Sequence, residues 1–392
     1  MDRQALSRLA ARQKGAVVEF AQDILLAVES GGAILGGRVP YDDDGFDRIV
    51  TAPGRTDRSL LIQPKGALTL QRGRSFEFRV PLWKLPSDPS NYFAALFPMK
   101  DTAPWVADDF WFVPGRALLA GSSRSKARVI RVPRVPDPSN RWERFRIPRA
   151  HLARAYARAL RLKAPPARAR ARSTLSETAQ AFVIETALKL HLTMGTAGAL
   201  QTWDPFVDRQ GLDASVNFSG SPVFLGLQPK GAFGPGPDGL IQVHVARSTF
   251  QPAPFAFLVI LEFNPSTLTL GEFAWFIPTL AIAKRVARSR DTLVFKVSPN
   301  PKSTKDNFLP WRYPTAQLPG VVATALAALA DDPHLRRVPC RPHEVASAGR
   351  SILGPRFSKV ADDPTRLAQL LHQAVLASKG RSGHRRRPRA FK

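Results

Sequence analysis

The stretch Leu60-Leu-Ile-Gln-Pro-Lys-Gly-Ala67 returns later in the chain as Leu225-Gly-Leu-Gln-Pro-Lys-Gly-Ala232. Each copy follows a Gly-x-Asp triplet, which is Gly45-Phe-Asp47 in the first case and Gly211-Leu-Asp213 in the second. The same short motifs in the same order indicate an internal duplication of the chain.

Further matches fall at nearly the same separation. It is 166 residues between Asp47 and Asp213, and 164 between Trp111 and Trp275. The apolar run 92–97 matches 257–262 at a separation of 165. Solenoid repeats have periods of about 20 to 50 residues, so these copies are domain-sized. Each is long enough to enclose its own hydrophobic core, which predicts two tandem α/β domains.

The charge balance points to a polyanionic partner. The chain carries 57 Lys and Arg against 31 Asp and Glu, a net charge of +26, and nucleic acid is the commonest partner of such a chain. An anionic membrane surface is the competing explanation, but apolar runs such as 255–261 are far shorter than the roughly 18 residues of a spanning helix. We expect a soluble, cytoplasmic chain, which a single cysteine, Cys340, also fits.

The residue pattern predicts helix, strands and helix in the first copy, and the same order in the second. Apolar residues at helical spacing predict a helix over 17–28, ended by Gly31-Gly32. The predicted strands are 47–50, 59–63, 76–80, 92–97 and 110–113, and a Pro-started Ala/Arg helix follows at 148–160.

These elements give five segments. They are a first domain at 1–163, a basic Pro/Arg linker at 164–176, a second domain at 177–333, a C-terminal helical extension at 334–379 and a basic disordered tail at 380–392.

The repeated motifs contain the side chains of a metal site. An Asp at the start of one strand and a Gln-x-Lys on the next would gather a carboxylate, an amide oxygen, a backbone carbonyl and an ammonium around one point. Magnesium prefers oxygen ligands and binds through one or two carboxylates with substrate phosphates. Lys65 and Lys230 would lie beside the metal-bound water, where a cation offsets developing charge.

The motif series Gly15-x-x-x-Glu19, Asp42-x-x-Gly45-x-Asp47 and Gln63-x-Lys65 resembles that of the PD-(D/E)XK nuclease superfamily, in particular its Mrr-like, Gln-x-Lys branch. The resemblance covers residues 10–115 and 177–280. It implies two restriction-endonuclease-like domains, each a mixed sheet flanked by helices, and Mg²⁺-dependent phosphodiester hydrolysis, with Mn²⁺ as a substitute.

The resemblance also implies a role for each residue. In the first copy Asp47 and Gln63 would be metal-site ligands, Lys65 catalytic and Glu19 an accessory ligand. In the second copy the matching residues are Asp213, Gln228, Lys230 and Glu185, and Asp208 stands where Asp42 does.

Two features depart from the family pattern. Pro64 and Pro229 occupy a strand position where proline removes a hydrogen-bond donor, which would mark either a bulge or edge at the site or a branch that has lost its chemistry. Glu19 lies off the apolar helical stripe. It could therefore be either a metal ligand or a solvated or hydrogen-bonded helix residue.

Other motifs have simpler interpretations. We expect Trp111 and Trp275 in the core and the Gly-Pro-rich stretch 234–239 in a turn. A zinc site at His334, Cys340 and His343 lacks the usual ligand spacing. The Asp and Gln-Pro-Lys pairs themselves have a structural alternative, in which Asp caps a turn and Lys ends a strand.

The predicted function is a single-chain, pseudo-dimeric DNA endonuclease with one magnesium site per domain. The expected phosphate contacts are Arg168, Arg170, Arg172, Arg385, Arg386 and Arg387. RNA remains an alternative substrate, and a monomer suffices although the pseudo-dimer could pair again. The alternative function is a non-catalytic nucleic-acid-binding or scaffolding protein that retains the fold.

Overall fold

The computed structural model describes residues 9, 11–38, 47–52, 55–67, 70–71, 74–86, 88–100, 106–120, 126–163, 175–204, 212–250, 252–288, 291–303, 306–332, 335 and 337–382. Two compact units appear, Met1–Leu190 with Asn264–Thr269, and His191–Phe263 with Leu270–Lys392. Most of the predicted linker lies outside the described residues, so the proposed domain boundaries stay a prediction.

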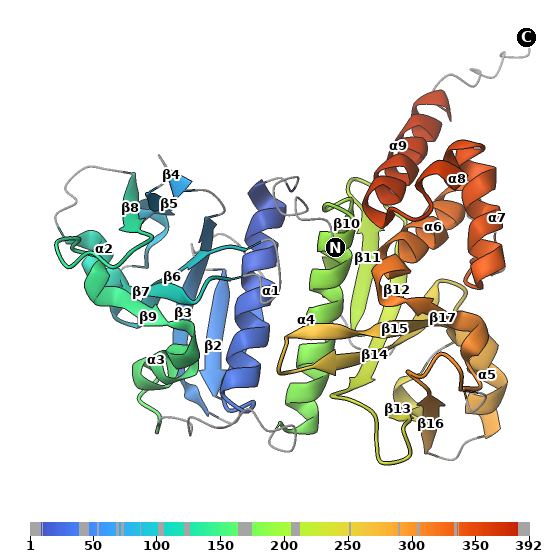
Figure 1. The fold of residues 1–392 in the computed structure, drawn as a ribbon, viewed down its shortest axis with the longest axis horizontal. Coiled ribbons are helices and arrows are strands. Elements are labelled where there is room, and N and C mark those ends of the chain that lie inside the picture. The colour runs from blue at the N-terminus through green and yellow to red at the C-terminus, as the bar shows by residue number, and fades with distance from the viewer. Residues whose placement is uncertain are drawn as a thin grey trace, which may run out of the picture. The chain divides into compact units, whose positions relative to one another are not determined.

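The first repeat contains a helix and a six-stranded mixed sheet (Figure 1). The sheet order is β1-β2-β3-β6-β7-β9, with β3 and β6 parallel and the other neighbours antiparallel. The elements are α1 (Ala11–Glu29), β1 (Leu35–Arg38), β2 (Arg48–Ala52), β3 (Arg55–Ala67), β6 (Tyr92–Pro98), β7 (Asp109–Pro114) and β9 (Arg146–Pro148). The helix predicted over 17–28 is confirmed within α1.

Helix α1 covers one face of this sheet. A Cβ on Gly66 of β3 would come within 2.3 Å of the Val18 side chain, so the glycine permits close approach of α1 to β3. Val17, Phe20, Ile24 and Val28 of the predicted apolar stripe are all buried. Gly31 and Gly32, with φ of 65° and 79°, end the helix in the left-handed region that glycine adopts without strain.

A smaller sheet lies on the other side of the core. Its order is β4-β5-β8, from β4 (Leu70–Gln71), β5 (Ser75–Pro81) and β8 (Ala127–Pro133). Alternate residues of β5 and β8, Phe78, Val80, Ile130 and Val132, pack with Tyr92 of β6 and Trp111 of β7 in one buried cluster. The repeat continues with α2 (Gly115–Leu119) and ends with α3 (Leu152–Ala159).

The second repeat has the same sheet order, β10-β11-β12-β14-β15-β17, and a two-stranded sheet β13-β16. Its elements are α4 (Glu177–Gly195), β10 (Leu200–Trp203), β11 (Ala214–Phe218), β12 (Leu225–Ala232), β13 (Ile241–Ala246), β14 (Ala256–Asn264), β15 (Thr269–Pro278), α5 (Thr279–Arg288), β16 (Thr292–Val297), β17 (Arg312–Pro314) and α6 (Leu318–Asp331). The predicted α/β class, two tandem mixed sheets flanked by helices, is therefore confirmed.

Strand register refines the equivalence between the repeats. Gln63 lies opposite Ala94, whereas Gln228 lies opposite Leu258. The separation between β6 and β14 is therefore 164 residues, as it is for the two tryptophans, and the separation of 165 expected for this run was wrong by one. The duplication also extends beyond the matched motifs, because β9 with α3 has its counterpart in β17 with α6.

Three helices follow the second repeat. They are α7 (Pro342–Leu353), α8 (Arg356–Val360) and α9 (Pro364–Ser382). Both α7 and α9 pack on α6, whose apolar residues are buried. Within the described residues, no helix combines the length and apolar character that crossing a bilayer requires.

Candidate active site

The first repeat brings Asp47 and Lys65 together. Asp47 immediately precedes β2, and its N–H donates to the Ile62 carbonyl of β3 at 3.1 Å. This bond fixes the start of β2 beside the middle of β3. The Lys65 ammonium lies 3.5 Å from Asp47 Oδ2, and the two side chains are 30% and 22% exposed. The pair is therefore reachable from solvent, as a site for a macromolecular substrate must be.

Gln63 is the buried member of the site. It is 1% exposed, and its Oε1 accepts a hydrogen bond of 2.8 Å from the Tyr92 hydroxyl. Burial, and then the nearby Asp47 carboxylate, raise the pKa of Tyr92 above its usual range, so the hydroxyl keeps its proton and remains a donor. Tyr92 therefore fixes which atom of the Gln63 amide faces it.

Side chains alternate along a strand, which places Gln63 and Lys65 on one face of the sheet. Gly66 faces Val18 of α1, so Gln63 and Lys65 point to the opposite face. Leu61 and Ala67, which share their parity, pack against the cluster beneath β5 and β8. The candidate site therefore belongs to the face that carries the smaller sheet.

The position of Pro64 explains how β3 tolerates a proline. Ile62 faces β2, because its carbonyl accepts from Asp47, and successive residues of a strand turn their backbone groups to alternate edges. The backbone groups of Pro64 therefore point to the same edge of β3 as those of Ile62. Pro64 lies beyond Arg48↔Ile62, the last described pair between β2 and β3, so its missing N–H removes no described hydrogen bond. Its carbonyl oxygen points to the edge where Asp47 lies.

The second repeat builds the same arrangement. The Asp213 N–H donates to the Leu227 carbonyl at 3.1 Å, and the Lys230 ammonium lies 3.1 Å from Asp213 Oδ2. The Lys230 and Asp213 side chains are 26% and 29% exposed. Gln228 is buried, at 3% exposure, and Pro229 follows it in β12 as Pro64 does in β3.

The two sites differ at the residue that holds the glutamine. In the first repeat Leu61 of β3 lies opposite Tyr92 of β6. In the second repeat Gly226, the equivalent of Leu61, lies opposite Ala256. The second repeat therefore has alanine where the first has the tyrosine hydroxyl. Sequence analysis missed Tyr92 as a site residue. The sequence marks Tyr92 only by a single hydroxyl at the start of an apolar strand. Its contact with Gln63 follows from the parallel register of β3 and β6, which the sequence does not give.

The helical glutamates remain predictions as metal ligands. Glu185 forms an ion pair with Lys189, one turn along α4. The position equivalent to Lys189 in the first repeat is Asp23, which forms a buried ion pair with Arg48 of β2. Glu19 lies half-buried on α1, the helix on the face away from the Gln63 and Lys65 side chains.

Several predicted residues lie outside the described residues. These are Asp42, Asp208, His334 and the six arginines Arg168, Arg170, Arg172, Arg385, Arg386 and Arg387. Both predicted core tryptophans are confirmed, since Trp111 and Trp275 are 1% and 0% exposed. The turn at 234–239 is also confirmed, with Gly239 N bonded to Gly236 O at 2.9 Å.

The described part of the chain contains no group of three or more His, Cys, Asp or Glu placed to hold a metal ion. An Asp with a Gln oxygen and a backbone carbonyl falls outside that kind of group. Cys340 instead belongs to the packing at the start of α7, where its N–H donates to Glu344 at 3.2 Å and burial raises the pKa of its thiol to about 11.

No protein-family model and no curated protein matches this chain. Among solved structures, the bacterial homing endonuclease I-Ssp6803I has a weak, partial similarity. The TM-score is 0.25, with 16% sequence identity over 35% of this chain and 86% of that chain. A likeness at this level carries no argument about this protein, whose interpretation depends on its own residues.

Proposed function

We propose that this protein is a metal-dependent phosphodiester hydrolase that acts on DNA, with one site in each repeat. The observation that supports the proposal most is that both repeats place a partly exposed Lys–Asp pair, at 3.5 and 3.1 Å, beside a buried glutamine. The motif order that produces this arrangement resembles that of PD-(D/E)XK nucleases. A net charge of +26 suits a nucleic-acid substrate.

The donor set fits a hard divalent cation such as Mg²⁺, with Mn²⁺ as a substitute. Asp47 offers a carboxylate and Pro64 a backbone carbonyl at the same edge of β3. Gln63 Oε1 has two lone pairs, of which Tyr92 uses one. All three are oxygen donors, as Mg²⁺ requires. In the second repeat the donors would be Asp213, Pro229 and Gln228.

A bound divalent cation would supply Lewis acidity and lower the pKa of a water. The residues of the chain provide the remaining functions. Lys65 and Lys230 are exposed enough to contact a phosphate and would offset the negative charge that develops on it. Because each ammonium is held by an aspartate across two strands, it is positioned before the substrate arrives.

A non-catalytic nucleic-acid-binding protein is the second candidate. The specific observation in its favour is that the polar groups have partners within the fold, with Lys65 on Asp47, Lys230 on Asp213 and Glu185 on Lys189. A site that has lost its chemistry could keep these ion pairs for local structure alone.

Two lysine variants separate the candidates. We would compare the full chain with Lys65→Met, Lys230→Met and the double variant on supercoiled plasmid and single-stranded DNA, in Mg²⁺, Mn²⁺ or EDTA. The matched controls are Lys100→Met and Lys296→Met, which remove surface lysines that also pair with an aspartate, at 3.0 and 3.7 Å.

The proposal predicts metal-dependent cleavage that the double variant abolishes and the controls retain. Each single variant should still nick the plasmid, because the other site remains intact. DNA binding should change little in the double variant, since it loses at most two phosphate contacts. If the wild-type chain binds DNA but cleaves none of these substrates with either metal, the binding protein is the correct assignment.

A further inference from the structure

One segment of the first repeat carries a large share of the positive charge of the chain. Residues 126–163, from β8 to α3, contain twelve Lys and Arg against two Asp and Glu. The equivalent residues 291–329 of the second repeat contain four against two. The net charges are therefore +10 and +2 for segments of the same fold. Since the fold is shared, it does not require this charge, and a different role must account for it.

Part of this charge surrounds a surface pocket. The pocket has a volume of about 340 Å³ and is lined by Val129, Arg131, Asn140, Arg141 and Trp142. It lies at the outward face of β8, where the exposed Val129 and Arg131 alternate with the buried Ile130 and Val132. In the register of the small sheet, Arg79 opposes Val129, which adds a further exposed guanidinium to this face.

The guanidinium groups around the pocket are held in place by aromatic rings. Arg141 lies 4.5 Å from the centroid of the Trp142 ring, and Arg144 lies 4.8 Å from that of Phe145. Asn140 fixes the loop between them, because it accepts from the Trp142 N–H at 2.9 Å and donates to the Arg131 carbonyl at 3.0 Å. Stacked guanidiniums keep their N–H groups directed outward, ready for bidentate contact with phosphate.

The acidic residues of the segment do not neutralise these two arginines. Asp137 accepts from the N–H and hydroxyl of Ser139, at 2.9 and 2.6 Å. Glu143 pairs with Arg146 at 3.0 Å. Among the described residues of the pocket, Arg131 pairs with a carboxylate, that of Glu77, at 2.9 Å, and its own side chain is 70% exposed.

Cations also crowd one another here. Burial, and then the charge of Arg141, lower the pKa of Arg128, so the two guanidiniums are close enough to repel. The Arg128 guanidinium itself donates to the Leu118 and Ala120 carbonyls, at 2.9 and 2.6 Å. The matching strand β16 exposes Thr292, Val294 and Lys296 instead.

We propose that Arg131, Arg141 and Arg144, around this pocket of the first repeat, bind the phosphate backbone of duplex DNA, and that the equivalent surface of the second repeat does not. We call these three residues the arginine patch. The choice of DNA among polyanions rests on the proposed function, whereas the location of the anion-binding surface rests on the charges and contacts above. The duplex would then be held mainly by one repeat although both repeats carry a site.

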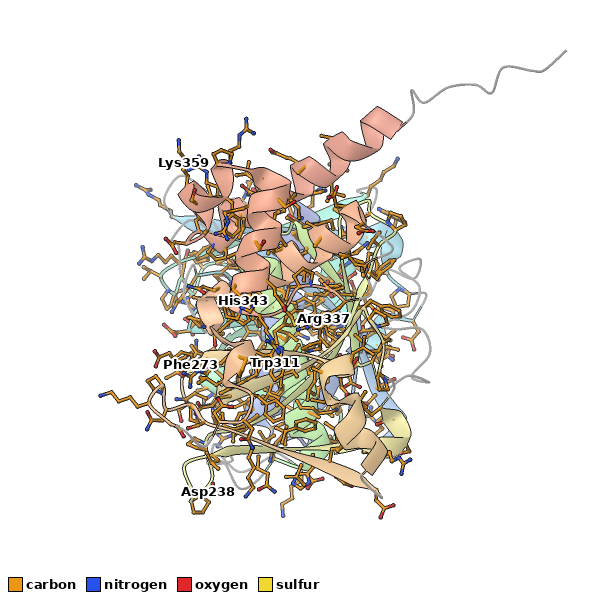
Figure 2. All side chains as sticks on the ribbon, turned by 90° about the vertical axis from the view of Figure 1, so that its right-hand side faces the viewer. Asp238, Phe273, Trp311, Arg337, His343 and Lys359 are labelled. Carbon is orange, nitrogen blue, oxygen red and sulfur yellow. The ribbon has the colours of Figure 1, made fainter. Side chains whose placement is uncertain are left out.

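The test is DNA binding by the full-length triple variant Arg131→Gln/Arg141→Gln/Arg144→Gln. A fluorescently labelled duplex is titrated in EDTA at several KCl concentrations, so that cleavage plays no part. The control triple variant is Lys296→Gln/Lys302→Gln/Lys359→Gln, which removes the same charge from exposed positions of the second unit. Lys359 and Asp238, the partner of Lys296, lie at opposite ends of the face shown in Figure 2. Circular dichroism confirms that both variants are folded.

Each lost phosphate contact lowers the slope of log K against log salt by about 1. We expect the arginine variant to lower it by about 3 and the control by less than about 1. Equal effects of the two variants would mean that only net charge matters, and would overturn the proposal. So would wild-type binding to phosphatidylserine vesicles but not to the duplex.

This outcome is independent of cleavage. If the lysine variants show that the chain is no nuclease while the arginine variant still loses DNA binding, the proposed function fails and the arginine patch stands. If cleavage depends on Lys65 and Lys230 but the arginine variant binds DNA as the wild type does, only the arginine patch is refuted.

Discussion

Tyr92→Phe should destabilise the first repeat, and a second tyrosine offers a matched control. Tyr92 is fully buried and donates to Gln63 Oε1 at 2.8 Å. Tyr156 of α3 is also fully buried, but its hydroxyl has no hydrogen-bond partner among the described residues. The two Tyr→Phe changes therefore remove the same atom from the same kind of surroundings, with and without a bond.

The magnitude follows from the bond that is lost. In Tyr92→Phe the Gln63 oxygen remains buried, at 1% exposure, without its donor, and such an acceptor costs about 1 to 3 kcal/mol. Tyr156→Phe removes a hydroxyl that burial already penalises, so it should be neutral or stabilise by up to about 1 kcal/mol. We expect the two variants to differ by about 2 kcal/mol in unfolding free energy.

Native-state hydrogen exchange read by mass spectrometry measures this difference locally. Peptides from β3 and β6 report the first repeat. Peptides from β12 and β14 serve as an internal reference, because Ala256 occupies the position of Tyr92 there and these strands should be unaffected. Equal losses of protection in the two variants would refute the reasoning, since the hydrogen bond to Gln63 would then contribute nothing.

Three further predictions concern buried groups. Burial lowers the pKa of His191. Below about pH 6.5 the unfolded chain therefore binds a proton that the native ring resists, and the unfolding free energy should fall by up to about 1.4 kcal/mol for each unit by which the pH drops. Urea titrations of His191→Gln should lack this pH dependence. Asp23→Leu removes the carboxylate that pairs with the buried Arg48 guanidinium and should cost about 3 to 5 kcal/mol, whereas Asp23→Leu/Arg48→Met should recover most of the loss in thermal unfolding. The Cys340 thiol has a pKa raised to about 11 and no exposed surface. In the native protein it should therefore react with a thiol reagent more than about 100-fold slower than free cysteine, and urea unfolding should remove this protection. Rapid labelling of the native protein would instead show that the start of α7 opens.

The duplication and the pairing of Asp with Lys could be predicted from the sequence, because both depend on short motifs at fixed positions in adjacent antiparallel strands. Asp47 precedes β2, and Lys65 lies in β3, its hairpin neighbour. Only a short connection separates the two strands, so order along the chain nearly determines their contact.

The contact of Tyr92 with Gln63 could not be predicted in this way. It requires the parallel pairing of β3 with β6, whose connection spans residues 68–91 and includes two strands of the other sheet, β4 and β5. A parallel pair needs a long crossover, and a long crossover allows several registers. One residue of error, as in our alignment of 92–97 with 257–262, moves a side chain to the opposite face.

The extent of the duplication was hidden for a different reason. Helix α3 has the sequence LARAYARA and exposes arginines, while its counterpart α6 has the sequence LPGVVATALAALAD and is buried from Leu318 to Ala328. The difference follows from their surroundings, because α7 and α9 cover α6. Two helices in the same place of one fold therefore share little sequence, and comparison of residues alone stops where the covering elements begin.

The two prolines have a consequence for how the sheets meet other chains. Pro64 and Pro229 turn a face without a donor to the edge where Asp47 and Asp213 lie, so a strand added at that point would lack a rung of its ladder. Proline at an open edge is one of the means by which β-proteins avoid joining edge to edge with copies of themselves. Within the described part of the chain, each proline would therefore disfavour the pairing of a strand from another copy at that point.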